Sequence, residues 1–246
     1  MDVLGWRKKI GVLVPSTNTI VEPDFYQMAV PGVTGHFSRI HVRDQDMGSN
    51  TAFRNLLTQL REETEYAVQR VMTADPDYLV MGMSAETFWG GLEGNRELKS
   101  HIGKLSGLSV ATGAEACQRV LELFQVKRIG VVTPYQPVGD ENVVKFFGDL
   151  GVEVVALKGL KCASAVSIAH VTEDTLRDAL MEVDSDKTEA LIQVGTNLSM
   201  LRLADEAERW LGKPVIAINA AIWWMALRDN GISDRMYGLG RLLREF

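Results

Sequence analysis

Thiol and imidazole groups are scarce in this chain of 246 residues. It has two cysteines, Cys117 and Cys162, which form no Cys-x-x-Cys motif, and four scattered histidines, at positions 36, 41, 101 and 170. None of these side chains lies at metal-ligand spacing from another, so we expect no metal site. We also expect no disulfide, and the helical pattern around Cys117 indicates a thiol buried by packing.

An excess of positive charge and long apolar runs are absent as well. The 26 Lys and Arg residues are outnumbered by 32 Asp and Glu residues, and a net charge of −6 gives no overall field to attract nucleic acid. No apolar run approaches the roughly 20 residues that cross a bilayer, and residues 1–9 lack the apolar core of a signal peptide. We therefore expect a cytoplasmic protein with no nucleic-acid or membrane partner.

What the chain does have is an ordinary globular composition and an internal repeat. Hydrophobic residues make up 46% and charged residues 24% of the chain, which excludes disorder. Residues 10–16 (IGVLVPS) match residues 129–135 (IGVVTPY), and each copy follows a basic pair. The other matching pairs, in the same order, are 77–82 with 189–195 and 110–114 with 216–220. Three matches in one order indicate a duplication.

The repeated segments predict the fold class. They are short aliphatic runs without the alternation of a half-exposed strand, so they predict parallel strands buried on both faces. Segments with helical periodicity lie between them, at residues 50–73, 173–183 and 201–211. Alternating strands and helices predict an α/β fold of two parallel-sheet halves related by pseudo-twofold symmetry. We expect the halves to cover residues 1–112 and 113–246, with the last helix, 220–229, packing back on the first half.

The topology also predicts where a ligand binds. Open parallel sheets bind ligands beyond the carboxyl ends of their strands, and two facing halves turn that edge into a cleft. The candidates in the first half are Pro15, Ser16, Thr17, Asn18, Thr19, Gly82, Met83, Ser84, Ala85, Glu86 and Thr87. Those in the second half are Thr133, Pro134, Tyr135, Gly195, Thr196, Asn197, Ser199 and Asn219.

These candidates are rich in hydroxyl and amide groups and poor in charge. Backbone N–H groups where a loop enters a helix bind anions, and side chains such as Ser16, Asn18, Ser84, Thr196 and Asn197 would add donors. Such a site suits a small carboxylate and can hold an enolate-like charge. The same residue types are also ordinary N-caps and turn formers, which is the structural alternative for each of them taken singly.

With these residues the chain resembles the aspartate/glutamate racemase superfamily, on the branch of maleate cis-trans isomerases and arylmalonate decarboxylases. The resemblance covers nearly the whole chain. It is most specific at residues 10–19, at residues 131–135, and from residues 214–216 through Asn219 to the helix with Trp223 and Trp224. It implies two Rossmann-like halves around a pseudo-twofold cleft, and a homo-oligomer.

The resemblance also implies roles for single residues. Asn18 is expected to hold a substrate carboxylate, while Ser84 and Tyr135 help to form the donor pocket. The chemistry of the family usually depends on two thiols, one from each half, and both of these positions are glycine here, Gly82 and Gly195. A donor Thr of the decarboxylase pocket corresponds to Met83.

A two-thiol acid–base pair and a thiolate nucleophile are therefore absent at these positions. We expect a cysteine-independent mechanism without a cofactor, in which Glu86, Tyr135 or a bound water carries the proton. Like-charge repulsion near a bound anion would favour the protonated form of Glu86. The alternative for Glu86 is an acidic residue in the first turn of a helix, where the dipole favours it.

Three functions remain open. The leading one is an isomerase, decarboxylase or lyase acting on a small carboxylate through an enolate-like anion, with Ser84, Glu86 and Tyr135 as catalytic residues. The second is a hydrolase in which Glu86 activates a bound water, and the third is a carboxylate-binding protein without catalysis. The expected substrate-binding residues are Pro15, Ser16, Asn18, Thr19, Gly82, Met83, Thr133, Gly195, Thr196, Asn197 and Asn219.

Overall fold

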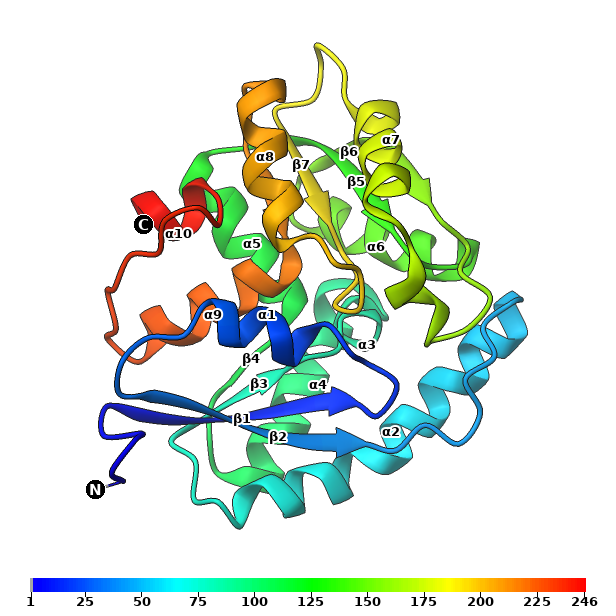
Figure 1. Ribbon diagram of the computed structural model, residues 1–246. Coiled ribbons are helices and arrows are strands. Elements are labelled where there is room, and N and C mark those ends of the chain that lie inside the picture. The colour runs from blue at the N-terminus through cyan, green and yellow to red at the C-terminus, as the bar shows by residue number, and fades with distance from the viewer. Residues whose placement is uncertain (1) are drawn as a thin grey trace.

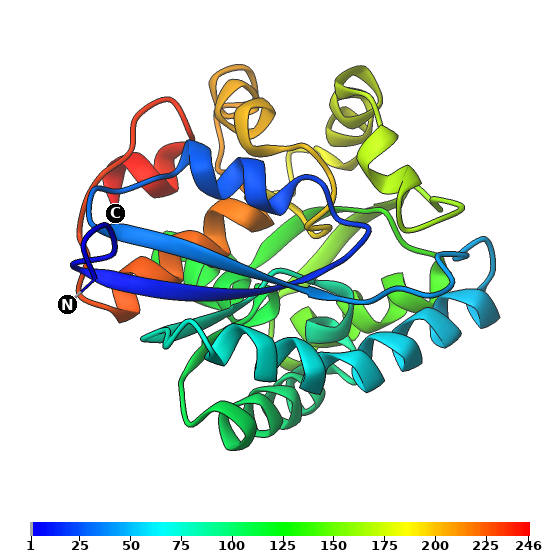
Figure 2. The ribbon, with the colours of Figure 1, turned by 60° about the horizontal axis from the view of Figure 1, so that its bottom comes forward.

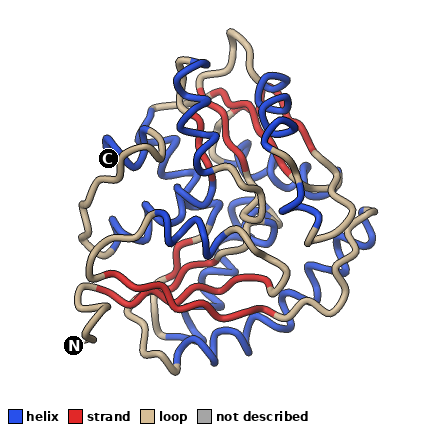
Figure 3. The backbone as a smooth tube through the Cα atoms, in the orientation of Figure 1, coloured by secondary structure: helices blue, strands red, loops and turns tan. Residues whose placement is uncertain are grey.

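Two four-stranded parallel sheets form the frame of the protein in the computed structural model, which describes residues 2–246. The first sheet has the order β2-β1-β3-β4, with β1 (Lys8–Pro15), β2 (Val33–Ile40), β3 (Tyr78–Met81) and β4 (Val110–Ala111). The second has the order β6-β5-β7-β8, with β5 (Arg128–Thr133), β6 (Glu153–Gly159), β7 (Ala190–Gln193) and β8 (Val215–Ala217). The predicted α/β fold of two similar parallel-sheet halves is confirmed (Figures 1 and 3).

The repeat in the sequence corresponds to a repeat in the strand register. Ile10 of β1 pairs with Tyr78 of β3, and the matching Ile129 of β5 pairs with Ala190 of β7. All residues of β3 and β7 are buried, because helices cover both faces of each sheet. The lack of alternation in these segments is therefore explained by burial on both sides.

Helices connect the strands and cover the sheets. They are α1 (Val21–Gln27), α2 (Asn50–Met72), α3 (Ala85–Phe88), α4 (Gly91–Ser106), α5 (Gly113–Phe124), α6 (Pro137–Asp149), the 3-10 helix η1 (Ser167–His170), α7 (Glu173–Val183), α8 (Leu201–Leu211), α9 (Ile218–Asp229) and α10 (Arg241–Glu245). The three helices predicted by periodicity are α2, α7 and α8, and α2 ends one residue earlier than predicted. The hydroxyl of Ser49 caps α2 by accepting from the N–H of Ala52 (3.1 Å). Among residues 2–246, no helix has the length and apolar composition of a membrane span.

Helix α9 joins the two halves. It directly follows β8 of the second sheet, but it contacts β3 and β4 of the first sheet as well as α1 and α5. In Figures 1 and 2 it is the orange helix beside the blue α1. Ten of its twelve residues are buried, which explains its nearly uniform apolar sequence. It begins at Ile218, two residues before the predicted start, and the division of the halves at residues 112 and 113 stays a prediction.

Candidate functional site

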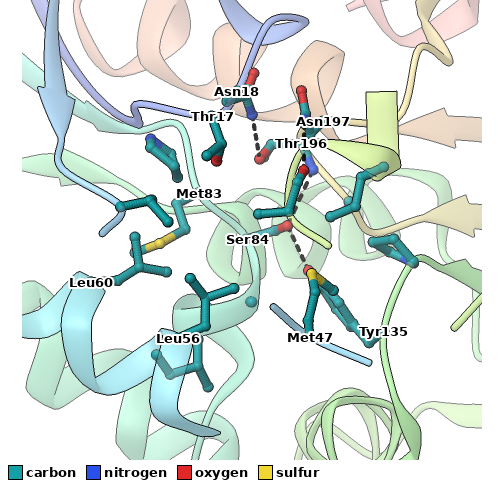
Figure 4. A pocket seen from close by; sticks show the side chains of 18 of the residues that line it. Thr17, Asn18, Met47, Leu56, Leu60, Met83, Ser84, Tyr135, Thr196 and Asn197 are labelled. Carbon is teal, nitrogen blue, oxygen red and sulfur yellow. Dashed lines mark hydrogen bonds between the residues drawn. The ribbon is translucent and has the colours of Figure 1, made fainter. Parts of the chain in front are cut away.

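A cavity of about 60 Å³ lies where the central strands of both sheets end. Its walls include residues at the end of β1 and within three residues after β3, β5 and β7, so both halves contribute (Figure 4). The lining residues are Pro15, Thr17, Asn18, Val42, Met47, Phe53, Leu56, Leu57, Leu60, Met83, Ser84, Ala85, Pro134, Tyr135, Ala165, Ile168, Gly195, Thr196 and Asn197.

The structure brings together eight of the fourteen residues predicted for the site. Those that line the cavity are Pro15, Asn18, Met83, Ser84, Tyr135, Gly195, Thr196 and Asn197. Those that do not line it are Ser16, Thr19, Gly82, Glu86, Thr133 and Asn219. The structure gives the position of each of these residues, and the roles assigned to all fourteen stay predictions.

Ser84 and Tyr135 form a buried pair of hydroxyls across the two halves. The Ser84 Oγ and the Tyr135 hydroxyl oxygen are 2.7 Å apart, and the N–H of Thr196 donates to the same Ser84 Oγ (3.2 Å). In Figure 4 Ser84 lies between Tyr135 and Thr196. Burial raises the pKa of Tyr135, although its hydrogen bond with Ser84 opposes this rise. Tyr135 is therefore a neutral hydroxyl at ordinary pH and can donate a hydrogen bond to an anion.

The asparagine side chains are largely occupied by structural hydrogen bonds. The Asn18 Oδ1 accepts from the N–H groups of Ile20 and Val21 (both 3.0 Å) at the start of α1, and its Nδ2 donates to the Thr196 Oγ1 (3.3 Å). The oxygen of Asn18 therefore caps the start of α1, which is the structural alternative named for such residues. One N–H of its amide has no protein acceptor among the described residues.

Asn197 ties three loops together. Its Oδ1 accepts from the N–H of Thr19 (3.0 Å), and its Nδ2 donates to the carbonyl of Ala165 (3.0 Å). The N–H of Leu198 donates to the carbonyl of Gly195 (2.9 Å), which closes a β-turn with Thr196 and Asn197 at its centre. Within residues 2–246 the backbone N–H of Asn197 has no protein acceptor. It is thus a free donor on a residue that lines the cavity.

The opposite wall of the cavity is apolar, and Met83 is its one residue that the sequence analysis predicted for the site. It is built by Val42, Met47, Phe53, Leu56, Leu57, Leu60 and Met83, with Ala165 and Ile168 from the segment around η1. Figure 4 shows Leu56 and Leu60 on the side of the cavity away from Asn18 and Asn197. The signal in the sequence was the helical periodicity of residues 50–73, which predicted the helix but not its place in the wall of a cavity.

Glu86, predicted as a proton carrier, lies outside the cavity lining. Its Oε1 forms an ion pair with the Nε of Arg61 on α2 (2.5 Å). Its Oε2 is buried and has no hydrogen-bond partner among residues 2–246. Burial raises the pKa of Glu86, and Arg61 opposes this effect. The carboxylate therefore joins helices α2 and α3, and the structure does not bring it to the donors of the cavity.

Four other predicted residues support the cavity without lining it. The Ser16 Oγ accepts from the N–H of Val42 (3.0 Å), and the Thr133 Oγ1 accepts from the N–H of Tyr135 (3.1 Å) and donates to Asp140. Thr19 contributes its N–H to Asn197, as described above. The Asn219 Nδ2 donates to the Asp24 Oδ2 (2.7 Å) and to the carbonyl of Thr196 (3.0 Å).

The two glycines at the expected thiol positions are closely packed. A Cβ atom at position 195 would lie 2.7 Å from the Cδ of Pro134, so a side chain there requires the proline ring to move. A Cβ atom at position 82 would lie 3.2 Å from the carbonyl oxygen of Leu13, a tight contact. The glycines thus match the packing around this cavity.

Neither cysteine lines the cavity. Cys117 is fully buried in α5, and burial raises the pKa of its thiol to about 12, which keeps it protonated at neutral pH. Cys162 follows β6 and is also buried. No group of three or more His, Cys, Asp and Glu side chains suited to a metal ion is found between residues 2 and 246.

Comparisons with known proteins show the family and agree with the fold. A family model described as arylmalonate decarboxylase matches residues 10–243. The chain is 24% identical to a maleate isomerase from Nocardia farcinica over 97% of this chain and 96% of that protein. It is 28% identical to the arylmalonate decarboxylase of Bordetella bronchiseptica over 68% of this chain and 70% of that protein.

Solved structures show the same architecture. A maleate cis-trans isomerase from Nocardia farcinica with a covalently bound succinylcysteine intermediate has a TM-score of 0.87 at 22% identity, covering 97% of this chain and 99% of that one. A crystal structure of arylmalonate decarboxylase has a TM-score of 0.74 at 20% identity, covering 96% and 98% of the two chains.

Proposed function

Since the chain belongs to the arylmalonate decarboxylase family, we propose that it is a decarboxylase of a substituted malonate that works without a cysteine thiol. The substrate would be a small dicarboxylate with an apolar substituent on the carbon between its carboxylates. The product would be the corresponding monocarboxylate.

The composition of the cavity wall carries this proposal. Its lining, as far as the described chain goes, contains no Asp, Glu, His, Lys, Arg or Cys, and Tyr135 is the one ionisable side chain in it. Racemisation needs a base that removes a proton from carbon, and isomerisation by covalent addition needs a nucleophile. Decarboxylation needs neither, because cleavage of the carbon–carbon bond itself leaves the electron pair behind.

The hydrogen-bond donors suit the intermediate of that reaction. As carbon dioxide leaves, the electron pair of the broken bond spreads onto the remaining carboxylate as an enolate. The Ser84–Tyr135 pair has one hydroxyl proton left over from the hydrogen bond between its members, and the N–H of Asn197 is a second donor. Donors that are already fixed in place stabilise charge as it develops. A proton from the Tyr135 hydroxyl or from water then completes the product, and water restores the tyrosine proton.

The two faces of the cavity favour a substrate with one apolar group. Carboxylate oxygens match the side with Asn18, Ser84 and Tyr135, whereas the wall from α2 excludes water and suits an aryl or alkyl group. Maleate carries carboxylates at both ends and would place one of them against leucine side chains. The resemblance also assigns glycine to the two positions where the family has thiols, so a succinylcysteine intermediate is not expected here.

A test of the function is turnover of phenylmalonate, followed by NMR as loss of substrate and appearance of phenylacetate, with maleate assayed in parallel. Ser84→Ala is expected to lower kcat/KM by about 10²- to 10³-fold, because it removes a donor to the developing charge. Ser38→Ala is the matched control, since Ser38 is buried like Ser84 but does not line the cavity. Conversion of maleate but not of substituted malonates would contradict the proposal.

The absence of a thiol and a base from the lining also favours a second candidate, a carboxylate-binding protein without turnover. Binding of phenylmalonate and maleate with no turnover of either would support it. The hydrolase alternative is not proposed, because its base, Glu86, is held by Arg61 outside the cavity.

A further inference from the structure

Asp24 is a carboxyl group buried in α1 without a cation. Asp24 is 4% exposed, and it forms no ion pair with any residue between 2 and 246. Its hydrogen-bond partner is the Asn219 Nδ2 of α9, 2.7 Å from the Asp24 Oδ2. A buried carboxyl group with so little compensation is unfavourable for folding, which suggests a role other than stability.

Asn219 connects Asp24 to Thr196, a residue that lines the cavity. Its Nδ2 carries two protons, of which one is donated to Asp24 and the other to the carbonyl of Thr196 (3.0 Å). Two acceptors on the same side fix the orientation of the amide, because its oxygen cannot replace the nitrogen there. The Asn219 Oδ1 is buried and has no partner in the described part of the chain.

The Thr196 carbonyl belongs to the central peptide of the turn between Gly195 and Leu198. In β-turns this peptide has two common orientations, which differ by a flip that reverses its carbonyl and its N–H. A planar trans peptide holds these two groups on opposite sides. When Asn219 holds the carbonyl of Thr196, the free N–H of Asn197 points the opposite way.

We propose that Asp24 and Asn219 are positioning residues that fix the central peptide of this turn, so that the Asn197 N–H is directed to a carboxylate in the cavity. Asp24 holds Asn219, Asn219 holds the Thr196 carbonyl, and neither residue lines the cavity. The N–H of Thr196 contacts Ser84 from the same turn, so the Ser84–Tyr135 pair depends on the same anchor. The role of the bound carboxylate rests on the proposed function, whereas the anchoring of the turn does not.

The chain offers a matched control for this contact. The Trp223 Nε1 on α9 donates to the carbonyl of Met28 at the end of α1 (2.9 Å). Like Asn219, it links α9 to α1 from a buried position, but it makes no hydrogen bond with the turn. Trp223→Phe therefore removes one link between the helices and leaves the Thr196 carbonyl bound.

The experiment compares Asn219→Leu, Asn219→Asp and Trp223→Phe with the full-length parent protein. Asn219→Asp retains the size of the side chain but cannot donate to both acceptors, so it covers the case in which Asn219→Leu does not fold. Two quantities are measured: the affinity for phenylacetate, by calorimetry, and the NMR shifts of the Thr196 carbonyl carbon and the Asn197 amide nitrogen.

Both Asn219 variants are expected to shift these two resonances and to weaken phenylacetate binding about tenfold. This is the affinity expected to be lost with one hydrogen bond, the one from the Asn197 N–H to the carboxylate. Trp223→Phe is expected to leave both close to their parent values. Unchanged resonances in the Asn219 variants, or equal changes in Trp223→Phe, would overturn the inference. If the parent protein neither binds phenylacetate nor converts phenylmalonate, the proposed function fails, and the resonances alone decide on the anchor.

Discussion

Thr196 connects the two halves of the site with three different groups. Its N–H donates to Ser84, its hydroxyl accepts from Asn18, and its carbonyl accepts from Asn219. Two of these partners precede residue 112 in the chain, and the third lies in the first turn of α9. A small movement of one half relative to the other would therefore change the positions of the hydroxyls and the turn together.

The pH dependence of stability should reveal the buried Asp24. Burial raises its pKa from 3.8 to about 6, so the folded protein holds this proton more tightly than the unfolded chain. The contribution of Asp24 to the free energy of unfolding then falls as pH rises from about 4 to about 6, by up to about 3 kcal/mol.

Asp24→Asn removes that ionisation, so its stability relative to the parent protein should improve by this amount between pH 4 and pH 7. Urea unfolding of both proteins across this range measures the difference, and other buried acids such as Asp140 cancel because both proteins contain them. A difference that does not change with pH would show that Asp24 titrates normally.

Some of these residues could be located from the sequence, and others could not. Ser84, Tyr135 and Thr196 lie two or three residues after buried strands, and in a parallel sheet such positions meet at one edge. Asn219 also follows a strand, but its side chain bonds Asp24, from another helix 195 residues away in the chain. The direction of a side chain across a contact between two halves is set by packing, which a single sequence does not reveal.

At the scale of elements, helix α2 forms the apolar wall of the cavity. Its apolar periodicity predicted a buried face, but the same pattern arises whether a helix packs on a sheet or lines a cavity. Arg61 on this helix and Glu86 on α3 form the ion pair that joins the apolar wall to the segment with Ser84.

Breaking this ion pair should affect stability more than catalysis. Arg61→Met leaves the Glu86 carboxylate buried without its cation, and we expect a loss of about 1–2 kcal/mol, less than for a fully buried pair because Arg61 is half exposed. Glu86→Gln should cost less, and the double variant should recover part of the loss of Arg61→Met.

Thermal unfolding and phenylmalonate turnover of the three variants check this expectation. We expect kcat to stay within about tenfold of the parent value in Glu86→Gln, because the carboxylate does not line the cavity. A much larger loss of kcat at unchanged stability would make Glu86 the proton carrier that the sequence suggested.

At the scale of the whole molecule, the duplication explains why the cavity exists. The same strand order in both sheets brings the ends of β1, β3, β5 and β7 to one place, which the repeat of short aliphatic segments made predictable. The crossing of α9 to the first sheet makes the two halves one packed unit. Association into a homo-oligomer stays a prediction, which light scattering of the purified protein would test.

In the proposed function, neutral donors act on the substrate in this cavity and no thiol takes part. The most direct measurement is the initial rate of phenylmalonate decarboxylation by the variant with both Cys117→Ala and Cys162→Ala. The expected kcat/KM equals that of the parent protein within about threefold, since neither cysteine lines the cavity. An active parent protein whose folded double variant has lost turnover would contradict it.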